Sequence, residues 1–95
     1  MISFTVRMTF KPDDRDEIAD ALRGLVAASR QEPGCVTYVA HTVVGDQDTV
    51  VIYEQYADDA AAEAHRQSGH FKKYAVGVLY QRMRERSRED LAALV

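Results

Sequence analysis

The chain has 95 residues, of which 46% are hydrophobic and 28% are charged, as expected for one small globular domain. A net charge of −3 and an isoelectric point near 5.5 argue against nucleic-acid binding, which requires a basic surface. The single cysteine, Cys35, excludes an internal disulfide and is typical of proteins in a reducing compartment.

No segment of the sequence predicts export or membrane insertion. The first residues reach Arg7 before any long apolar stretch builds up, so no signal peptide is expected. Nothing in the chain approaches the ~20 consecutive apolar residues of a membrane-spanning helix. We therefore expect a cytoplasmic protein that binds neither membranes nor nucleic acid.

Residues 2–10 alternate between apolar and polar side chains, which predicts a strand with one buried face. The apolar face comprises Ile2, Phe4, Val6, Met8 and Phe10. The segment after the strand contains Pro12, and Asp13 or Asp14 can cap the helix that follows. That helix is expected to reach about Arg30, because apolar residues recur three and four positions apart along it. Its apolar stripe comprises Ile18, Ala21, Leu22, Leu25 and Val26.

The segment from residue 35 to residue 56 predicts an antiparallel hairpin. Pro33 and Gly34 stop the preceding helix, because proline cannot continue it and glycine accepts positive φ. Residues 35–44 are mostly β-branched or aromatic, and residues 49–56 predict the next strand. Residues 45–48 have turn chemistry, so the two strands should pair directly.

Two short helices are expected next, separated by a break at Ser68 and Gly69. Asp58 caps the first helix, and Ser68 or Gly69 caps the second. The apolar stripe of the second helix comprises Phe71, Ala75, Val78 and Leu79.

Residues 81–95 fit either a strand or a short helix. Four arginines alternate as in a strand: Arg82, Arg84, Arg86 and Arg88. Residues 87–90, however, resemble the start of a helix. Because Glu85, Glu89 and Asp90 are interspersed, we interpret the arginines as a solvated surface with salt bridges.

The element order predicts an α+β fold of the ferredoxin-like, split β-α-β type, with a four-stranded antiparallel sheet in one domain spanning residues 1–95. Helices in this plan cover only one face of the sheet. The other face carries Thr5, Arg7 and Thr9, together with either Val51 and Tyr53 or Val50 and Ile52. A second copy of the chain could cover this face of the sheet. We therefore expect a homodimer whose two sheets close a dimeric α+β barrel.

Three motifs are specific when they occur together. They are Arg30-x-Glu32-Pro33-Gly34-Cys35-x-x-Tyr38, Val51-Ile52-Tyr53-Glu54-Gln55-Tyr56 and Glu63-Ala64-His65-x-x-Ser68-x-His70-Phe71. With them the chain resembles the antibiotic biosynthesis monooxygenase (ABM) family over roughly residues 2–79. The resemblance implies a dimeric α+β barrel. Members resemble cofactor-free oxygenases of aromatic polyketides and quinols, haem-degrading enzymes or sugar-phosphate isomerases.

The chain departs from the pattern of this family at four positions. Tyr56 stands where many members have a tryptophan at the end of the third strand. His65 replaces a tryptophan of the haem-degrading relatives, and Ala75 replaces their haem-ligating histidine. Val6 stands about where relatives often have an active-site asparagine. These departures argue against haem and remove one polar group from the expected site.

His65 is the candidate catalytic base. Oxygenation without a cofactor requires a substrate that transfers an electron to dioxygen once it is deprotonated, and an imidazole with an unperturbed pKa of ~6.5 suits that step. We expect His65 on the inner face of its helix beside Ala61 and Ala64, whose small side chains leave space over the sheet. The alternative is a half-buried structural histidine bonded to a backbone carbonyl.

The candidate substrate-binding residues are His70, Tyr74, Tyr56 and Glu54. His70 and Tyr74 are four residues apart and should share a helix face, although a helix-start role and a core role are the alternatives. Tyr56 is the strand tyrosine expected to contact a ligand. Glu54 interrupts an apolar strand and should pair with Arg7 or Arg30, or else lie beside His65 and orient its imidazole.

No motif for a metal or an organic cofactor is present. His65 and His70 are five residues apart across a helix break, and neither HExxH nor CxxC spacing occurs. Dinucleotide, P-loop and hydrolase signatures are also missing. Together with this absence, the resemblance to the ABM family implies a cofactor-independent monooxygenase that oxidises a small aromatic, phenolic or quinol-like substrate with dioxygen. The alternatives are an isomerase or similar proton-transfer enzyme, and a non-catalytic module that binds a small molecule.

Overall fold

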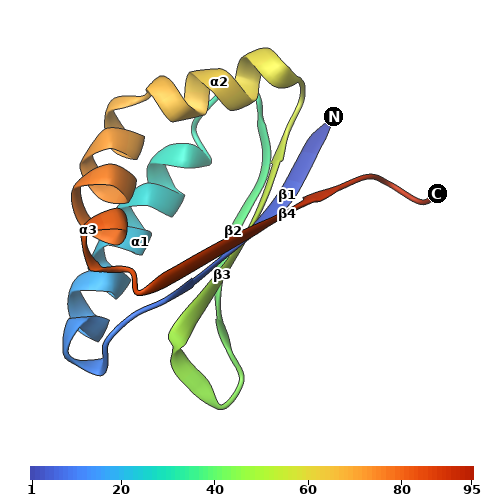
Figure 1. The fold of residues 1–95 in the computed structure, drawn as a ribbon. Coiled ribbons are helices and arrows are strands. Elements are labelled where there is room, and N and C mark those ends of the chain that lie inside the picture. Colours follow the sequence, from blue (N-terminus) through green and yellow to red (C-terminus); the bar gives the residue numbers. More distant parts are fainter.

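The computed structural model describes all 95 residues and contains one four-stranded antiparallel sheet (Figure 1). The elements are β1 (Ile2–Thr9), a 3-10 turn (Pro12–Asp14), α1 (Arg15–Ser29), β2 (Cys35–Val43), β3 (Asp46–Tyr56), α2 (Asp59–Gln67), a π-helix (Phe71–Leu79), α3 (Tyr80–Arg82) and β4 (Glu85–Leu91). The strands are arranged in the order β2-β3-β1-β4. The predicted ferredoxin-like α+β fold is confirmed.

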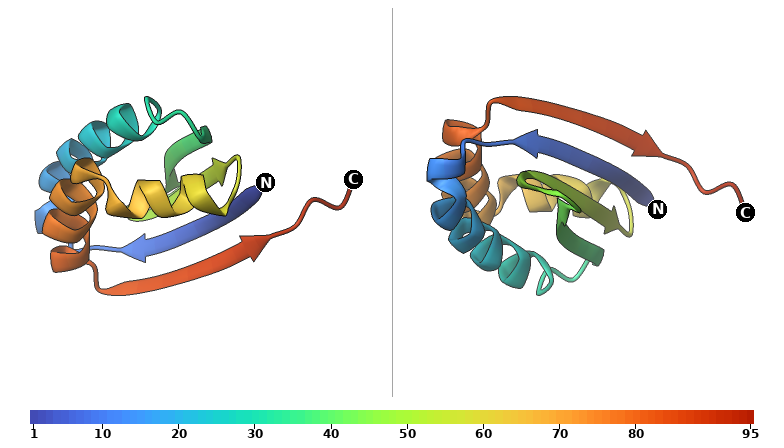
Figure 2. Two further views of the ribbon diagram at one scale, coloured as in Figure 1. Left: turned by 90° about the horizontal axis from the view of Figure 1, so that it is seen from above. Right: turned by 90° about the horizontal axis from the view of Figure 1, so that it is seen from below.

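The core lies between the sheet and the helices, which all cover the same face of the sheet (Figure 2). In β1 the apolar residues of the alternating pattern point to this face, where Val6 pairs with Ile52 and Met8 with Val50 of β3. The buried apolar residues are Phe4, Val6, Met8, Phe10, Ile18, Ala21, Leu25, Tyr38, Val50, Ile52, Tyr56, Ala62, Ala75 and Leu79. The predicted buried face of residues 2–10 is therefore confirmed.

The helix caps only partly follow the prediction. The cap of α2 is as expected, because the Asp58 carboxylate accepts a hydrogen bond from the Ala61 N–H at 2.8 Å. Ser68 likewise accepts from the Phe71 N–H at 3.2 Å. Asp14 occupies the cap position of α1, but its side chain makes no capping hydrogen bond, so the predicted aspartate cap is wrong there.

The segment Phe71–Leu79 is a π-helix rather than the expected α-helix. It ends where the Tyr80 N–H donates to the Ala75 carbonyl, five residues earlier. Ala75 and Leu79 are buried, and Phe71 packs against the core. None of the helices combines the length and the apolar character that crossing a membrane requires.

Residues 85–91 form strand β4, which resolves the ambiguity at the carboxyl-terminal end. In the pairing with β1, Arg88 lies opposite Val6 and Arg86 opposite Met8. Directly paired residues project to the same face of a sheet, so these two arginines lie on the side of the core. β4 is an edge strand and is exposed along its length.

The face of the sheet opposite the helices has no covering layer (Figure 2). On β3 this face carries Val51 and Tyr53, because Val50 and Ile52 are buried on the helical side. Tyr53 pairs with Thr5 of β1 and with Val39 of β2, so it lies within the uncovered face.

Candidate active site

A cavity of about 60 Å³ lies between the sheet and the helices. Its walls are mostly apolar, which is typical of pockets for small organic ligands. The charged and titratable side chains in its lining belong to Glu54, His65, Arg66, Tyr38, Tyr80, Arg86 and Arg88. The cavity therefore contains groups that can exchange protons within an apolar environment.

Helix α2 positions His65 at this cavity. His65 and Ala62 lie on the buried side of α2, and the His65 side chain is only 3% exposed. Aromatic rings surround the imidazole, with centroid distances of 5.5 Å to Tyr38, 5.2 Å to Tyr56 and 5.2 Å to Phe71. His65 faces inward as expected. Of the two alanines expected beside it, Ala61 is half-buried against the core and Ala64 is exposed, while Ala62 is the fully buried alanine of α2.

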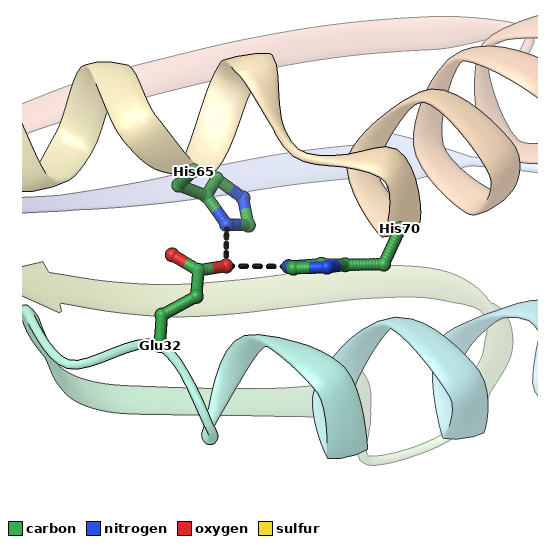
Figure 3. Close-up of side chains that lie close together, drawn as sticks. All are labelled: Glu32, His65 and His70. Carbon is green, nitrogen blue, oxygen red and sulfur yellow. Dashed lines mark hydrogen bonds and ion pairs between the residues drawn. The ribbon is translucent and has the colours of Figure 1, made fainter.

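Glu32 connects the two histidines through one carboxylate oxygen (Figure 3). His65 Nδ1 is 2.7 Å and His70 Nε2 is 2.5 Å from Glu32 Oε2. An ionised carboxylate only accepts hydrogen bonds, so each imidazole donates its N–H to it. The bond fixes the tautomer of neutral His65 and leaves Nε2 as the nitrogen with a free lone pair.

The loop that carries Glu32 packs directly on α2. Gly34 accepts a hydrogen bond from the Ala57 N–H at 2.9 Å, which ties the loop to the end of β3. A Cβ atom at position 34 would lie 2.3 Å from the Ala61 Cβ, so only glycine fits against this part of α2. The loop can therefore approach α2 closely enough for Glu32 to reach His65.

Glu32, His65 and His70 are also the residues that could hold a metal ion. Each offers one ligand atom, and the three atoms lie within 4.8 Å of one another. The sequence spacing of the two histidines did not reveal this cluster, because its third member lies in a distant loop. In the structure both nitrogens bond directly to the same Glu32 oxygen, which is the geometry of a hydrogen-bonded triad.

Glu54 is buried beside His65, with 5% of its surface exposed. Its Oε1 accepts a hydrogen bond from the Tyr56 hydroxyl at 2.6 Å and lies 3.6 Å from His65 Nε2. Burial raises the pKa of Glu54 to about 7, although the Tyr56 hydrogen bond and the Arg88 charge oppose that shift. Glu54 is therefore divided between its two protonation states near neutral pH.

The predicted partners Arg7 and Arg30 do not pair with Glu54. Arg30 donates to the Tyr38 carbonyl at 3.0 Å, and Arg7 lies on the other face of the sheet. The structure thus corrects the salt-bridge interpretation and supports the alternative, in which Glu54 lies beside His65.

His65 Nε2 is buried and has no hydrogen-bond partner. Burial lowers the pKa of His65, and the hydrogen bond to Glu32 opposes that shift. The neutral imidazole is therefore favoured at pH 7, with Nε2 free to accept a proton. Glu32 would stabilise the imidazolium that forms, so the arrangement is that of a base and its orienting carboxylate.

Comparison with known proteins identifies the family. The family model for antibiotic biosynthesis monooxygenase matches residues 1–76. The chain belongs to the ABM family. The relative named "Putative monooxygenase YcnE" from Bacillus subtilis is 32% identical over 74 residues, which are 78% of each chain.

Solved ABM-like structures share the whole architecture. One, described as an antibiotic biosynthesis monooxygenase, superposes with a TM-score of 0.93 at 26% identity and covers 100% of both chains. The structure of PA3566 from Pseudomonas aeruginosa has a TM-score of 0.89 at 30% identity, covering 99% of this chain and 94% of that one.

The predicted site residues of this ABM protein do not all converge. His65 and Glu54 line the cavity side by side, whereas His70 is connected to His65 only through Glu32 and does not line the cavity. Tyr56 is fully buried, and its hydroxyl is bonded to Glu54 rather than directed into the cavity. Tyr74 lies outside the cavity, where its ring occupies the space that a side chain at Gly24 would need.

Three residues of the ABM site were missed by sequence reasoning: Glu32, Arg86 and Arg88. Glu32 follows the carboxyl-terminal end of α1, where the helix dipole disfavours a negative charge, and that unfavourable position was the available signal. The arginines were interpreted as a solvated surface, because the face on which they lie depends on the register of β4 with β1.

Proposed function

We propose that this protein is a cofactor-independent monooxygenase that acts on a small aromatic, phenolic or quinol-like substrate. The observation that carries the proposal is the free lone pair of His65 Nε2 at the wall of a mostly apolar cavity. Membership of the ABM family and the name of the Bacillus subtilis relative support the same reaction class.

In the proposed reaction His65 Nε2 removes a proton from the substrate, and Glu32 stabilises the resulting imidazolium. The substrate anion transfers one electron to dioxygen, and the two radicals combine to form a carbon–oxygen bond. The resulting peroxide anion takes the proton back from the His65 imidazolium and becomes a hydroperoxide. The hydroperoxide then loses water and leaves a carbonyl group, so one oxygen atom remains in the product. Glu54 in its protonated state can supply the proton with which the other oxygen leaves.

A substrate must displace side chains to reach this site, because a space of about 60 Å³ holds a few water molecules and no aromatic ring. Phe71 and Tyr80 contact each other edge-on, at a centroid distance of 6.0 Å, on the helical side. Arg86 and Arg88 also line the cavity and belong to an exposed strand. We expect these arginines to move when a ligand binds.

Oxygen uptake by EDTA-treated protein is the first test of the proposal. We expect uptake above a heat-denatured control with at least one member of a panel of hydroquinones, anthrones and naphthols. With oxygen-18 gas, the product should contain one labelled oxygen atom. Hydrogen peroxide together with an unlabelled product would instead show an oxidase and contradict monooxygenation.

The two alternatives predict other outcomes of this experiment. Glu54 Oε1 lies 3.6 Å from His65 Nε2, and two such neighbouring proton-transfer groups also suit an isomerase that moves a proton between two carbons. Such an enzyme would exchange substrate hydrogen with deuterated water in the absence of oxygen. A module that only binds its ligand would show saturable binding with neither oxygen uptake nor exchange.

We also propose that the protein is a homodimer in which the uncovered face of the sheet packs against a second copy. Val39, Val51 and Tyr53 are only half-buried on that face, and no element of the same chain covers them. Burying this apolar surface would stabilise the dimer through the hydrophobic effect.

The substitution Tyr53→Asp should convert the dimer into a monomer at micromolar concentration, because it places a charge in the centre of the proposed interface. Analytical ultracentrifugation of both proteins measures the change. The matched control is Val76→Asp, which places the same charge on the exposed surface of the π-helix. A wild-type monomer, or a dimer that survives Tyr53→Asp unchanged, would contradict the proposed interface.

A further inference from the structure

Two arginines of the edge strand extend over the cavity that contains His65. Arg86 and Arg88 lie on the core side of the sheet, next to Met8 and Val6 of β1. The Arg88 guanidinium is 3.8 Å from the centroid of the Phe4 ring, a cation–π distance that holds it against the cavity wall. Both arginines line the cavity.

The cavity contains more positive than negative groups. Three arginines line it, and Glu54 is the single carboxylate in its lining. Arg66 pairs with Glu63, and Arg88 pairs with Asp90. Arg86 forms no ion pair, and its guanidinium is 5.6 Å from the centroid of the Tyr80 ring.

Because Glu63 and Asp90 neutralise two of these arginines, the excess positive charge of the lining belongs to Arg86. Strand β4 provides Arg86 and also Arg88, the second arginine beside the cavity wall. The Glu54 carboxylate does not fully neutralise this positive charge. Burial raises its pKa to about 7, so it is partly protonated at pH 7. Arg86 and Arg88 therefore line the same cavity as His65 and can contact a ligand that His65 also contacts.

We infer that the site selects an aromatic substrate that carries a carboxylate, which Arg86 and Arg88 bind. The inference rests on the proposed function in one respect, which is that the cavity lined by His65 is the substrate site. A guanidinium presents a planar fork of N–H donors that matches a carboxylate. The carboxylate would lie at the β4 side of the cavity, and the phenolic end of the ring would then point toward His65 Nε2.

Binding in the absence of oxygen tests this inference independently of turnover. Hydroquinone and gentisate form a matched pair, because gentisate is hydroquinone with one added carboxylate. Anaerobic titration calorimetry should show gentisate binding the wild type about tenfold tighter or more, as expected for charge-assisted hydrogen bonds. The double variant Arg86→Gln/Arg88→Gln should bind the two compounds with similar affinity.

Arg84→Gln is the matched control, because Arg84 is an exposed arginine of the same segment that does not line the cavity. It removes one positive charge and should keep the preference for gentisate. The affinity for hydroquinone should be the same in all three proteins, which also verifies that the double variant is folded.

Equal affinities in the wild type, binding of neither compound, or a preference that survives the double substitution would each overturn the inference. A protein that prefers gentisate but consumes no oxygen would support the carboxylate site and count against the proposed oxygenase. The two proposals therefore fail in different experiments.

Discussion

Replacing His65 by alanine is expected to lower the rate of oxygen uptake by about 10² to 10⁴-fold, the usual contribution of a general base. The physical reason is that the substitution removes the nitrogen that accepts the substrate proton, while the walls of the cavity remain. The rate is measured with the best substrate of the oxygen-uptake panel, and circular dichroism verifies the fold.

Two further variants separate a catalytic from a structural role of His65. His65→Gln keeps most of the side-chain volume without a basic nitrogen, so it should lose activity to the same extent. His41→Ala is the matched control, because His41 is an exposed histidine on a strand away from the cavity. Full turnover of His65→Ala would exclude His65 as the base.

Glu32 should act as a positioning residue through its hydrogen bond to His65 Nδ1. Glu32 does not line the cavity, so we expect Glu32→Gln to change the orientation and basicity of His65 rather than a direct contact with a substrate. This positioning role places the orienting group on a different segment from the base, as in other pairs of a base and its orienting carboxylate.

The second large effect concerns stability and pH. Burial raises the pKa of Glu54 from its ordinary value of 4.5 to about 7. The folded state therefore binds this proton more tightly than the unfolded state does. That contribution is complete below about pH 4.5 and is lost as the pH rises through about 7. At 1.36 kcal/mol per pKa unit, the shift corresponds to a loss of roughly 3 kcal/mol of unfolding free energy.

Glu54→Gln should remove this pH dependence, because glutamine does not titrate and can still accept the Tyr56 hydrogen bond. Urea unfolding at about pH 5 and pH 8, at fixed protein concentration, should show the variant gaining stability relative to the wild type at the higher pH. Glu63→Gln is the surface control, because its pKa is lowered by Gln67 and Arg66 instead. A wild type and a Glu54→Gln variant with parallel pH curves would show that Glu54 is ionised throughout.

Much of the fold was predictable because its determinants are local. The alternation in residues 2–10 specifies a half-buried strand. The hairpin was also predicted, but its turn consists of Val44 and Gly45 rather than residues 45–48, because β3 begins at Asp46, which already pairs with Val43. The carboxyl-terminal strand was not predictable in this way. Its alternating arginines and its helix-like start are both locally consistent, and pairing with β1 decides between them.

The candidate site was only partly predictable for a similar reason. His65 was recognisable on its helix, but its partner Glu32 is 33 residues away in sequence. The spacing of His70 and Tyr74 predicted a shared face, which holds for an α-helix. Tyr74 lies within a π-helix, where hydrogen bonds join residues five apart, so the four-residue rule does not apply.

The close contact between Gly34 and Ala61 fixes the distance between the Glu32 loop and helix α2. Glu32 and His65 belong to separate segments, and the spacing of those segments depends on a surface where one Cβ atom is missing. A methyl group at position 34 would lie 2.3 Å from the Ala61 Cβ and would force the loop and α2 apart. A residue without any functional group thus determines whether Glu32 can reach the His65 imidazole.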